Sequence, residues 1–251
     1  MKKIYSISMV VAAISLLAFS VPVHASKTDS RIESSAKKSY VFKTYLKNDD
    51  IKIQSKDGIV SLTGTVSEES HKSLARDTVS GLPGVKSVEN MLETKGEIPS
   101  KNSDTWVTTK VKTTLLFHRS VSAMTEVNTK DGIVTLQGNA ASQAEKDLTT
   151  EYVKDVEGVK GVNNVLTVSK SSAKTNRTAG EKIDDASITA LAKMTLLYHR
   201  STSALDTKVV TKNGVVTLSG KAKNKTEKNL ATKFVEDVHG VKNVKNHMTI
   251  E

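Results

Sequence analysis

The chain has no cysteine, only three prolines and a single tryptophan among its 251 residues. The absence of cysteine excludes disulfides and thiolate metal ligands. Phe, Trp and Tyr together make up 4% of the sequence, so we expect small cores of Val, Leu, Ile and Ala. Burial of aliphatic side chains must therefore stabilise the fold without a covalent cross-link.

One long hydrophobic run is present, and it lies at the N-terminus. Lys2 and Lys3 precede an apolar stretch over residues 4–23, which ends in a Val-His-Ala triplet with small residues at its first and last positions. This order is typical of a secretory signal peptide, so we predict that residues 1–25 are cleaved and that the mature protein is exported. A single membrane anchor is the alternative, because the run is close to the length that spans a bilayer. Cleavage removes two lysines and no acid, which lowers the net charge from +10 to +8.

Two short segments recur three times along the chain. The first reads Asp-Gly-Ile-Val-x-Leu-x-Gly, with Asn and Val as its first and third residues in the last copy, and the second reads Gly-Val-Lys-x-Val-x-Asn. In every copy the second segment begins 27 residues after the first. This invariant spacing indicates one structural module in three copies. The first segments occupy residues 57–64, 131–138 and 213–220, and the second segments occupy residues 84–90, 158–164 and 240–246.

The residues around these segments predict the elements of each module. Asp-Gly or Asn-Gly between two β-prone runs indicates a two-residue hairpin turn, because both turn residues must accept a positive φ. Between the two segments, Ala144, Leu148, Tyr152 and Val156 recur every four residues, which predicts a helix that ends near Gly158. A further amphipathic helix precedes the hairpin, and a third strand ends the module. The positions that we interpret as structural turn residues are Asp57, Gly58, Gly64, Gly84, Asp131, Gly132, Gly138, Gly158, Asn213, Gly214, Gly220 and Gly240.

The expected fold class is α+β, with three tandem αββαβ modules joined by polar linkers. In each module two helices cover one face of a mixed three-stranded sheet, and a right-handed crossover makes the last strand parallel to the second. Copy 1 lacks the Phe/Tyr-His-Arg-Ser stretch of the other copies, and we expect it to be a variant with a shorter loop. The expected organisation is a signal peptide (1–25), a disordered lead (26–36) and modules over 37–95, 104–170 and 183–251.

The two repeated segments, at their fixed spacing, make the chain resemble the BON family of bacterial envelope modules. The resemblance covers nearly all of the mature chain. It implies an αββαβ fold, which agrees with the element order above. It also implies a periplasmic protein of the osmotically inducible type, linked to envelope stress, whose modules attach to phospholipid membranes or interact with other envelope proteins.

No set of residues predicts catalysis, a metal site or a cofactor. The histidines outside the signal peptide do not follow a metal-ligand spacing, and the sequence has no nucleophile elbow or phosphate-binding glycine loop. Asp57 and Asp131 resemble paired acids, but Asn213 holds the same position in copy 3. That position therefore needs a turn residue and not a carboxylate, and we expect a protein that is not an enzyme.

A His-Arg pair follows an apolar helix end in copies 2 and 3. One interpretation is helix capping, because a cation there complements the helix dipole. The other is an exposed corner, where imidazole and guanidinium meet lipid phosphate and the preceding aromatic ring enters the membrane interface. The tryptophan of copy 2 is either a half-buried packing residue or an interfacial anchor. The candidate lipid or ligand contacts are Trp106, Phe117, His118, Arg119, Tyr198, His199 and Arg200.

The surplus of lysine and arginine favours an anionic partner. We expect anionic phospholipid or another envelope surface, with unfolded or envelope proteins as the alternative partners of a chaperone-like module. A passive spacer is a third interpretation. Nucleic acid is not expected, because the chain is predicted to be exported and does not interleave aromatic with basic residues. No feature of the sequence points to an oligomeric state.

Overall fold

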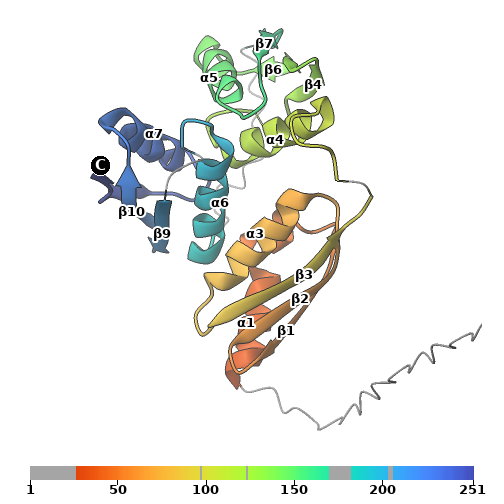
Figure 1. Cartoon of the computed structure of the whole chain (residues 1–251), viewed down its shortest axis with the longest axis vertical. Coiled ribbons are helices and arrows are strands. Elements are labelled where there is room, and N and C mark those ends of the chain that lie inside the picture. The colour runs from red at the N-terminus through yellow and green to blue at the C-terminus, as the bar shows by residue number, and fades with distance from the viewer. Residues whose placement is uncertain (1–26, 97, 123, 170–181, 203–205) are drawn as a thin grey trace, which may run out of the picture.

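The computed structural model describes residues 27–96, 98–122, 124–169, 182–202 and 206–251 (Figure 1). The predicted signal peptide and most of the linker between copies 2 and 3 lie outside these residues. Within the described part of the chain, no helix is both long and apolar enough to cross a membrane.

Three modules of the same design follow one another, which confirms the expected α+β class. Module 1 contains α1 (Lys27–Lys38), α2 (Tyr40–Thr44), β1 (Asp50–Lys56), β2 (Ile59–Val66), α3 (Glu69–Ser80) and β3 (Ser87–Thr94). Module 2 contains α4 (Asp104–Phe117), β4 (Glu126–Lys130), β5 (Ile133–Gln137), β6 (Asn139–Ala140), α5 (Gln143–Lys154), β7 (Gly161–Asn164) and β8 (Thr167–Val168). Module 3 contains α6 (Asp185–Tyr198), β9 (Asp206–Lys212), β10 (Val215–Ala222), α7 (Lys225–Glu236), β11 (Asn243–Asn246) and β12 (Thr249–Ile250).

Each sheet has the hairpin's second strand at its centre. In module 1, β2 pairs antiparallel with β1 and parallel with β3, and the other modules repeat this order. The first residue of each hairpin turn, Asp57, Asp131 or Asn213, has a φ of 54°. This left-handed conformation suits Asp and Asn better than most residues, which explains why either occurs there.

A second aspartate, near the start of the first helix of each module, holds the hairpin turn in place. In module 1, the Asp29 carboxylate accepts hydrogen bonds from the backbone N–H groups of Asp57 at 3.1 Å and Gly58 at 3.0 Å. Asp104 and Asp185 accept the same pair of bonds in modules 2 and 3, at 2.7–2.9 Å. Helix and hairpin are therefore connected in the same way three times.

The prediction of a disordered lead and a shortened module 1 is wrong. The lead is helix α1, and its apolar residues Ile32 and Ala36 are almost completely buried. Asp29 precedes the hairpin turn by 28 residues, as Asp185 does in module 3. Module 1 therefore has its full first helix, which breaks at Ser39 before the short helix α2.

The asparagine that ends the second repeated segment fastens the last strand to the second helix of its module. In module 3, the Asn246 amide donates to the carbonyl oxygen of Lys228 in α7 at 2.9 Å and accepts from the backbone N–H of Met248. Asn90 and Asn164 make the equivalent contacts in modules 1 and 2. This repeated residue thus has a structural role.

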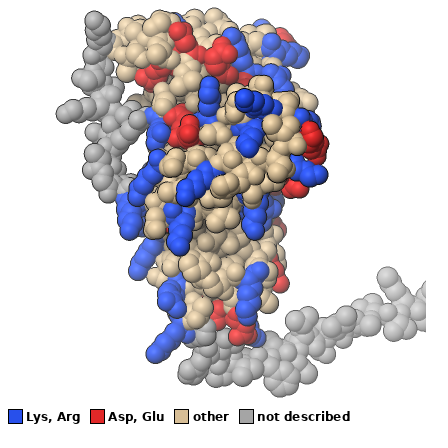
Figure 2. All heavy atoms as spheres, turned by 90° about the vertical axis from the view of Figure 1, so that its left-hand side faces the viewer, with Lys and Arg blue, Asp and Glu red and all other residues tan. Residues whose placement is uncertain are grey.

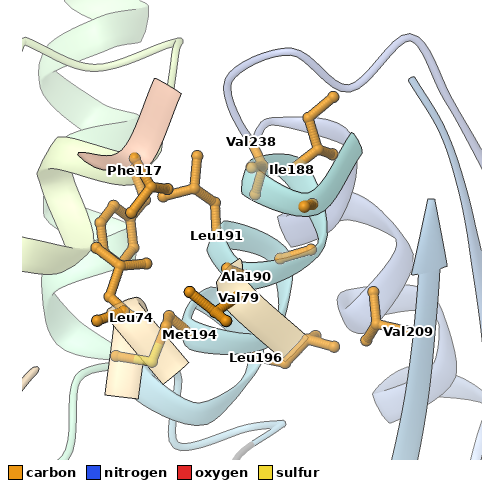
Figure 3. Close-up of a cluster of buried hydrophobic side chains, with 14 of the residues drawn as sticks. Leu74, Val79, Phe117, Ile188, Ala190, Leu191, Met194, Leu196, Val209 and Val238 are labelled. Carbon is orange, nitrogen blue, oxygen red and sulfur yellow. The ribbon is translucent and has the colours of Figure 1, made fainter. Parts of the chain in front are cut away.

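Helix α6 packs the three modules together. Eleven of its fourteen residues are buried, against six of fourteen in α4, the equivalent helix of module 2. One side of α6 covers its own sheet, and the other packs against α3 of module 1 (Figures 1 and 3). Phe117 of module 2 belongs to the same cluster of buried side chains (Figure 3). The modules thus pack against one another through shared buried side chains and are not separated by their linkers.

Candidate functional site

The predicted His-Arg corners are not exposed. Phe117 and His118 are each 1% exposed, Tyr198 is 7% exposed and His199 is fully buried. Arg119 and Arg200 alone extend toward solvent. The prediction of exposed imidazoles is therefore wrong, because the ends of α4 and α6 face each other and bury both histidines in a joint between modules 2 and 3.

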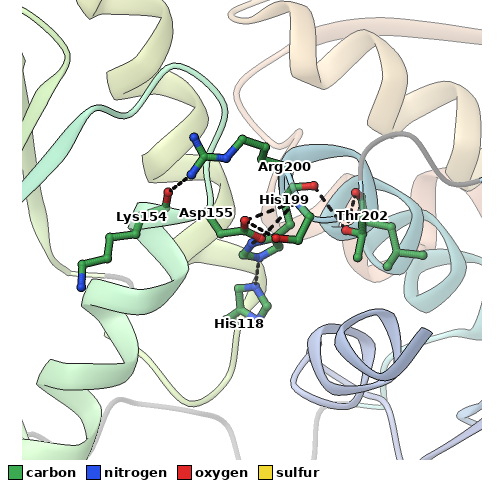
Figure 4. A network of polar contacts seen from close by, with 8 residues as sticks. His118, Lys154, Asp155, His199, Arg200 and Thr202 are labelled. Carbon is green, nitrogen blue, oxygen red and sulfur yellow. Dashed lines mark hydrogen bonds and ion pairs between the residues drawn. The ribbon is translucent and has the colours of Figure 1, made fainter. Parts of the chain in front are cut away.

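The two histidines meet at the centre of this joint (Figure 4). The Nε2 atoms of His118 and His199 lie 2.9 Å apart, within hydrogen-bond distance. The other ring nitrogen of each faces a carboxylate of the opposite module. His118 Nδ1 lies 3.2 Å from Asp237 Oδ2, and His199 Nδ1 lies 3.3 Å from Asp155 Oδ2, although neither contact meets hydrogen-bond geometry. The joint is thus an Asp-His-His-Asp chain that crosses between the modules three times.

Backbone contacts repeat the same exchange around the histidines. The backbone N–H of Arg119 donates to the carbonyl oxygen of Asp237 at 2.9 Å, and that of Arg200 donates to the carbonyl oxygen of Asp155 at 2.6 Å. The Arg200 guanidinium also donates to the Lys154 carbonyl oxygen at 2.8 Å (Figure 4). Each module therefore contributes the same motif to its partner, as in an isologous dimer interface, although both modules belong to one chain.

Aromatic rings close the two sides of the histidine pair. Tyr152 stacks on His118 with ring centroids 4.0 Å apart, and Phe234 stacks on His199 at 3.9 Å. Tyr152 and Phe234 occupy the same position of their modules. Only Tyr152 has a hydroxyl group, which donates to Asp237 Oδ2 at 2.8 Å. Burial raises the pKa of Tyr152 far above its ordinary value, and the nearby Asp237 carboxylate adds to this.

The joint changes the proton affinity of its acidic and basic groups. Burial lowers the pKa of His118, Asp237 opposes this effect, and His199 adds to it. For Asp155 and Asp237 burial alone would raise the pKa, but the histidine and serine of the opposite module lower it further than burial raises it. Both carboxylates are therefore held in their charged form beside the imidazoles.

The two aspartates of the joint were not among the predicted site residues. Asp155 and Asp237 occupy the same place in modules 2 and 3, three residues before the repeated glycine, and module 1 has Gly81 there. Module 1 also lacks the His-Arg-Ser stretch. The aspartate and the His-Arg-Ser stretch thus occur together in modules 2 and 3 and are both missing from module 1. This shared pattern is the signal that could have predicted a contact between the aspartates and the histidines.

Trp106 lies outside the joint. It is half-buried against the core of module 2, and the Lys110 ammonium lies 4.2 Å from the centroid of its ring and 5.2 Å from that of Tyr198. The three side chains line a pocket of about 480 Å³ between the modules. Across the described ranges, no group of three or more His, Asp or Glu side chains is arranged to hold a metal ion.

The uncovered face of the module 3 sheet is the most basic surface of the three sheets. Four exposed lysines alternate along β9, β10 and β11 with buried or half-buried residues, so they share the face opposite the helices. They are Lys208, Lys212, Lys221 and Lys245. The equivalent positions hold Lys52, Lys56, Thr65 and Glu89 in module 1 and Glu126, Lys130, Asn139 and Asn163 in module 2. We refer to the four lysines as the lysine face.

The charge of module 3 follows the same trend. Residues 184–251 contain eleven Lys and Arg against seven Asp and Glu, a net charge of +4, whereas residues 28–96 carry +1 and residues 103–170 carry no net charge. Two of the seven acids, Glu227 and Asp237, are buried. Lys and Arg accordingly spread over the side of the molecule on which module 3 lies (Figure 2).

Known proteins resemble the chain both in sequence and, more distantly, in structure. It is 33% identical over 143 residues to osmotically-inducible protein Y of Escherichia coli (strain K12), which covers 55% of this chain and 71% of that protein. Among solved structures, CdsD, a structural protein of the type III secretion system of Chlamydia trachomatis, covers 88% of this chain and 90% of its own at 16% identity and a TM-score of 0.25. The PrgH periplasmic domain covers 82% and 97% at 11% identity and a TM-score of 0.21.

The sequence profile of the BON domain matches three stretches, residues 28–96, 103–170 and 184–251. Together these stretches comprise the three modules of the structure. The first match includes helix α1, in agreement with a full-length module 1. The chain therefore belongs to the BON domain family, with three copies of the domain.

Proposed function

We propose that the chain is a non-enzymatic, periplasmic envelope-stress protein of the osmotic-stress type, which associates with anionic phospholipid membranes through the lysine face of module 3. The family and the name of the Escherichia coli relative support the stress assignment. The lysine face is the observation that supports membrane binding, because only module 3 has lysine at all four positions of this face.

The charge on this face suits a reversible attachment. A lysine close to an anionic membrane contributes about 1 kcal/mol, so four lysines contribute about 4 kcal/mol at most. The Nζ atom of Lys221 lies 3.8 Å from Oε1 of Glu251, and this ion pair reduces the contribution of Lys221 to membrane binding. An attraction of this size is weak and is screened by salt. We therefore expect peripheral binding that is strongest at low ionic strength.

Vesicle flotation tests the proposal. The mature chain is mixed with vesicles of phosphatidylglycerol and phosphatidylethanolamine, and with vesicles that contain only zwitterionic lipid. We expect flotation with the anionic vesicles alone, and its loss at high salt. The double variant Lys208→Glu with Lys245→Glu carries at each position the residue of a sister module, Glu126 or Glu89, so the fold tolerates it.

The matched control makes the same change of charge elsewhere. Lys52→Glu with Lys130→Glu alters the open sheet faces of modules 1 and 2. The module 3 variant should lose flotation, and the control should retain most of it. If both variants lose flotation equally, net charge and not the lysine face accounts for the binding. If the unaltered chain does not float at low salt, the membrane proposal is wrong.

A chaperone-like or protein-binding role is the second candidate. Exposed apolar side chains lie on outer strands of the sheets, with Met91 of β3 54% and Val210 of β9 50% exposed. Strand edges with apolar side chains can pair with an extended segment of another protein. Suppression of the aggregation of an unfolded client, with no flotation on anionic vesicles, would favour this role over the first.

A further inference from the structure

We propose that His118 and His199 form a buried proton-binding site, which holds one proton between the two imidazoles and makes the joint between modules 2 and 3 open in acid. The proposal concerns the contact between modules and does not depend on what the lysine face binds.

The geometry of the pair fixes the number of protons. Each Nδ1 lies 3.2–3.3 Å from a carboxylate oxygen, which favours a proton on that nitrogen. The two Nε2 atoms, 2.9 Å apart, need one donor and one acceptor. Three of the four ring nitrogens therefore carry a proton, and the pair has a single positive charge.

Any other proton count disfavours this contact. Without the shared proton, either two Nε2 lone pairs face each other or one Nδ1 atom turns its lone pair toward a carboxylate. With a second proton on the facing nitrogens, two N–H groups and two positive charges face each other at 2.9 Å. The side chains of both histidines are fully buried, so water cannot screen this repulsion.

The groups around the pair come from the ends of four helices. From α4 and α6 come Arg119 and Arg200, whose guanidinium groups reach toward solvent. From α5 and α7 come Asp155, Asp237 and Tyr152. Each of the two carboxylates already faces an Nδ1 atom, so neither is placed to accept a second proton held on the facing Nε2 atoms.

Opening of the joint relieves the repulsion. It breaks the backbone contacts of Arg119 and Arg200 with the opposite module and brings the imidazoles into water. The contact between modules 1 and 3 centres on a cluster of apolar side chains from α3 and α6, which contains no histidine (Figure 3). At the start of α6, Asp184 and Ser187 also accept hydrogen bonds from the backbone N–H groups of Tyr40 and Val41. Acid should therefore separate module 2 from module 3 while modules 1 and 3 stay together.

Distance measurements between spin labels test this directly, because the natural chain has no cysteine. Ala144→Cys on α5 and Lys225→Cys on α7 place labels at exposed positions of modules 2 and 3. Arg76→Cys on α3 with Lys225→Cys reports on modules 1 and 3. From about pH 6 to about pH 4, across the lower range of histidine titration, we expect the first distance to lengthen and broaden and the second to stay constant. An unchanged first distance overturns the proposal, and so does a change in both, because general acid unfolding then accounts for the result.

His199→Gln is the decisive variant. The glutamine amide can donate to His118 Nε2 without a shared proton, so full protonation gives the site one positive charge, against two in the unaltered pair. We expect the midpoint of opening to fall by about one pH unit or more, and an unchanged midpoint contradicts the proposal. Imidazole nitrogen chemical shifts of the unaltered chain give a second test at about pH 6. Three protonated nitrogens are expected in the pair, and two protonated nitrogens overturn the proposal.

Discussion

Tyr152 of module 2 donates a hydrogen bond of 2.8 Å to the Asp237 carboxylate of module 3, and no equivalent bond reaches Asp155 from module 3. The equivalent residue, Phe234, stacks on its histidine in the same way but has no hydroxyl group. The joint is thus symmetric in its histidines, its aspartates and the backbone bonds of its arginines, whereas the Tyr152 hydroxyl has no counterpart in module 3. The effect of that hydroxyl can be measured alone, because each module supplies the natural replacement for the other.

Tyr152→Phe should destabilise the joint. The change removes a hydrogen bond to a buried carboxylate, and bonds to charged groups contribute about 1.5–3 kcal/mol. We expect a decrease of this size in the free energy of unfolding, measured by urea denaturation of the full chain. The reverse change, Phe234→Tyr, offers Asp155 the same bond and should leave stability equal or higher. A Tyr152→Phe variant as stable as the unaltered chain would show that water replaces the lost donor.

The aspartate that holds each hairpin turn should matter more than the aspartate within the turn. Asp29→Ala leaves the backbone N–H groups of Asp57 and Gly58 without their acceptor. Because unsatisfied buried donors cost about 1–3 kcal/mol, we expect a loss of that size. Asp57→Asn, which copies Asn213, is the control and should change stability by less than about 0.5 kcal/mol. Thermal unfolding of both variants measures the difference, and equal losses would contradict a larger role for Asp29 than for Asp57.

Much of each module could be predicted from the sequence, because local patterns determine it. The Asp-Gly or Asn-Gly turn and the alternation around it fix a hairpin, and the constant spacing of 27 residues fixes the helix between the repeats. The prediction of a short module 1 rests on its missing Phe/Tyr-His-Arg-Ser stretch, which does not mark the start of the module. The aspartate before each hairpin gives the correct alignment and includes helix α1.

The contacts between modules could not be predicted from one module at a time. A His-Arg pair after a helix end is compatible with an exposed corner and with a buried contact. The residue that distinguishes the two possibilities is the partner of the histidine, which lies far along the chain. His118 and Asp237, for example, are in different modules and meet only after both have folded. Comparison between the copies carries the missing information, since Asp155 and Asp237 occur only in the modules that have the histidines.

Comparison between the copies also identifies the second apolar side of α6, and it supports a further prediction. Ala190, Leu191 and Met194 are buried in the core shared with module 1, whereas the equivalent residues of α4 are Thr109, Lys110 and Thr113. A helix that is apolar all round is buried on all sides.

Leu191→Lys, which copies Lys110 of module 2, should therefore break the contact between modules 1 and 3. Burial of an unpaired ammonium group is unfavourable by several kcal/mol, so we expect the modules to separate or the chain to unfold. Small-angle scattering measures the increase in the radius of gyration. Leu197→Lys is the matched control on the same helix, because Leu197 is 51% exposed, and it should leave the radius unchanged. A compact Leu191→Lys variant would contradict a shared core.

Acid should destabilise the protein in two steps. The folded state lowers the pKa of His118, so the unfolded chain binds more protons than the folded one just below the ordinary histidine value of about 6.5. The stability associated with this group is present above that pH and is lost as the pH falls toward the lowered pKa. Asp155 and Asp237 also have lowered pKa values, so their contribution is present above about pH 3.9 and is lost as the pH falls through the folded values.

Urea denaturation at a series of pH values separates the two steps. In the first step the free energy of unfolding should fall by at most about 1.4 kcal/mol per pH unit, the slope for one proton. His118→Gln removes the group that takes up this proton, so its stability should be flat across the first step and still fall in the second. His71→Gln is the control, because His71 contacts Asp49 within module 1 and lies outside the joint. If both variants keep the first step, the proton is taken up elsewhere, and the buried histidine of the joint does not control the response of the fold to acid.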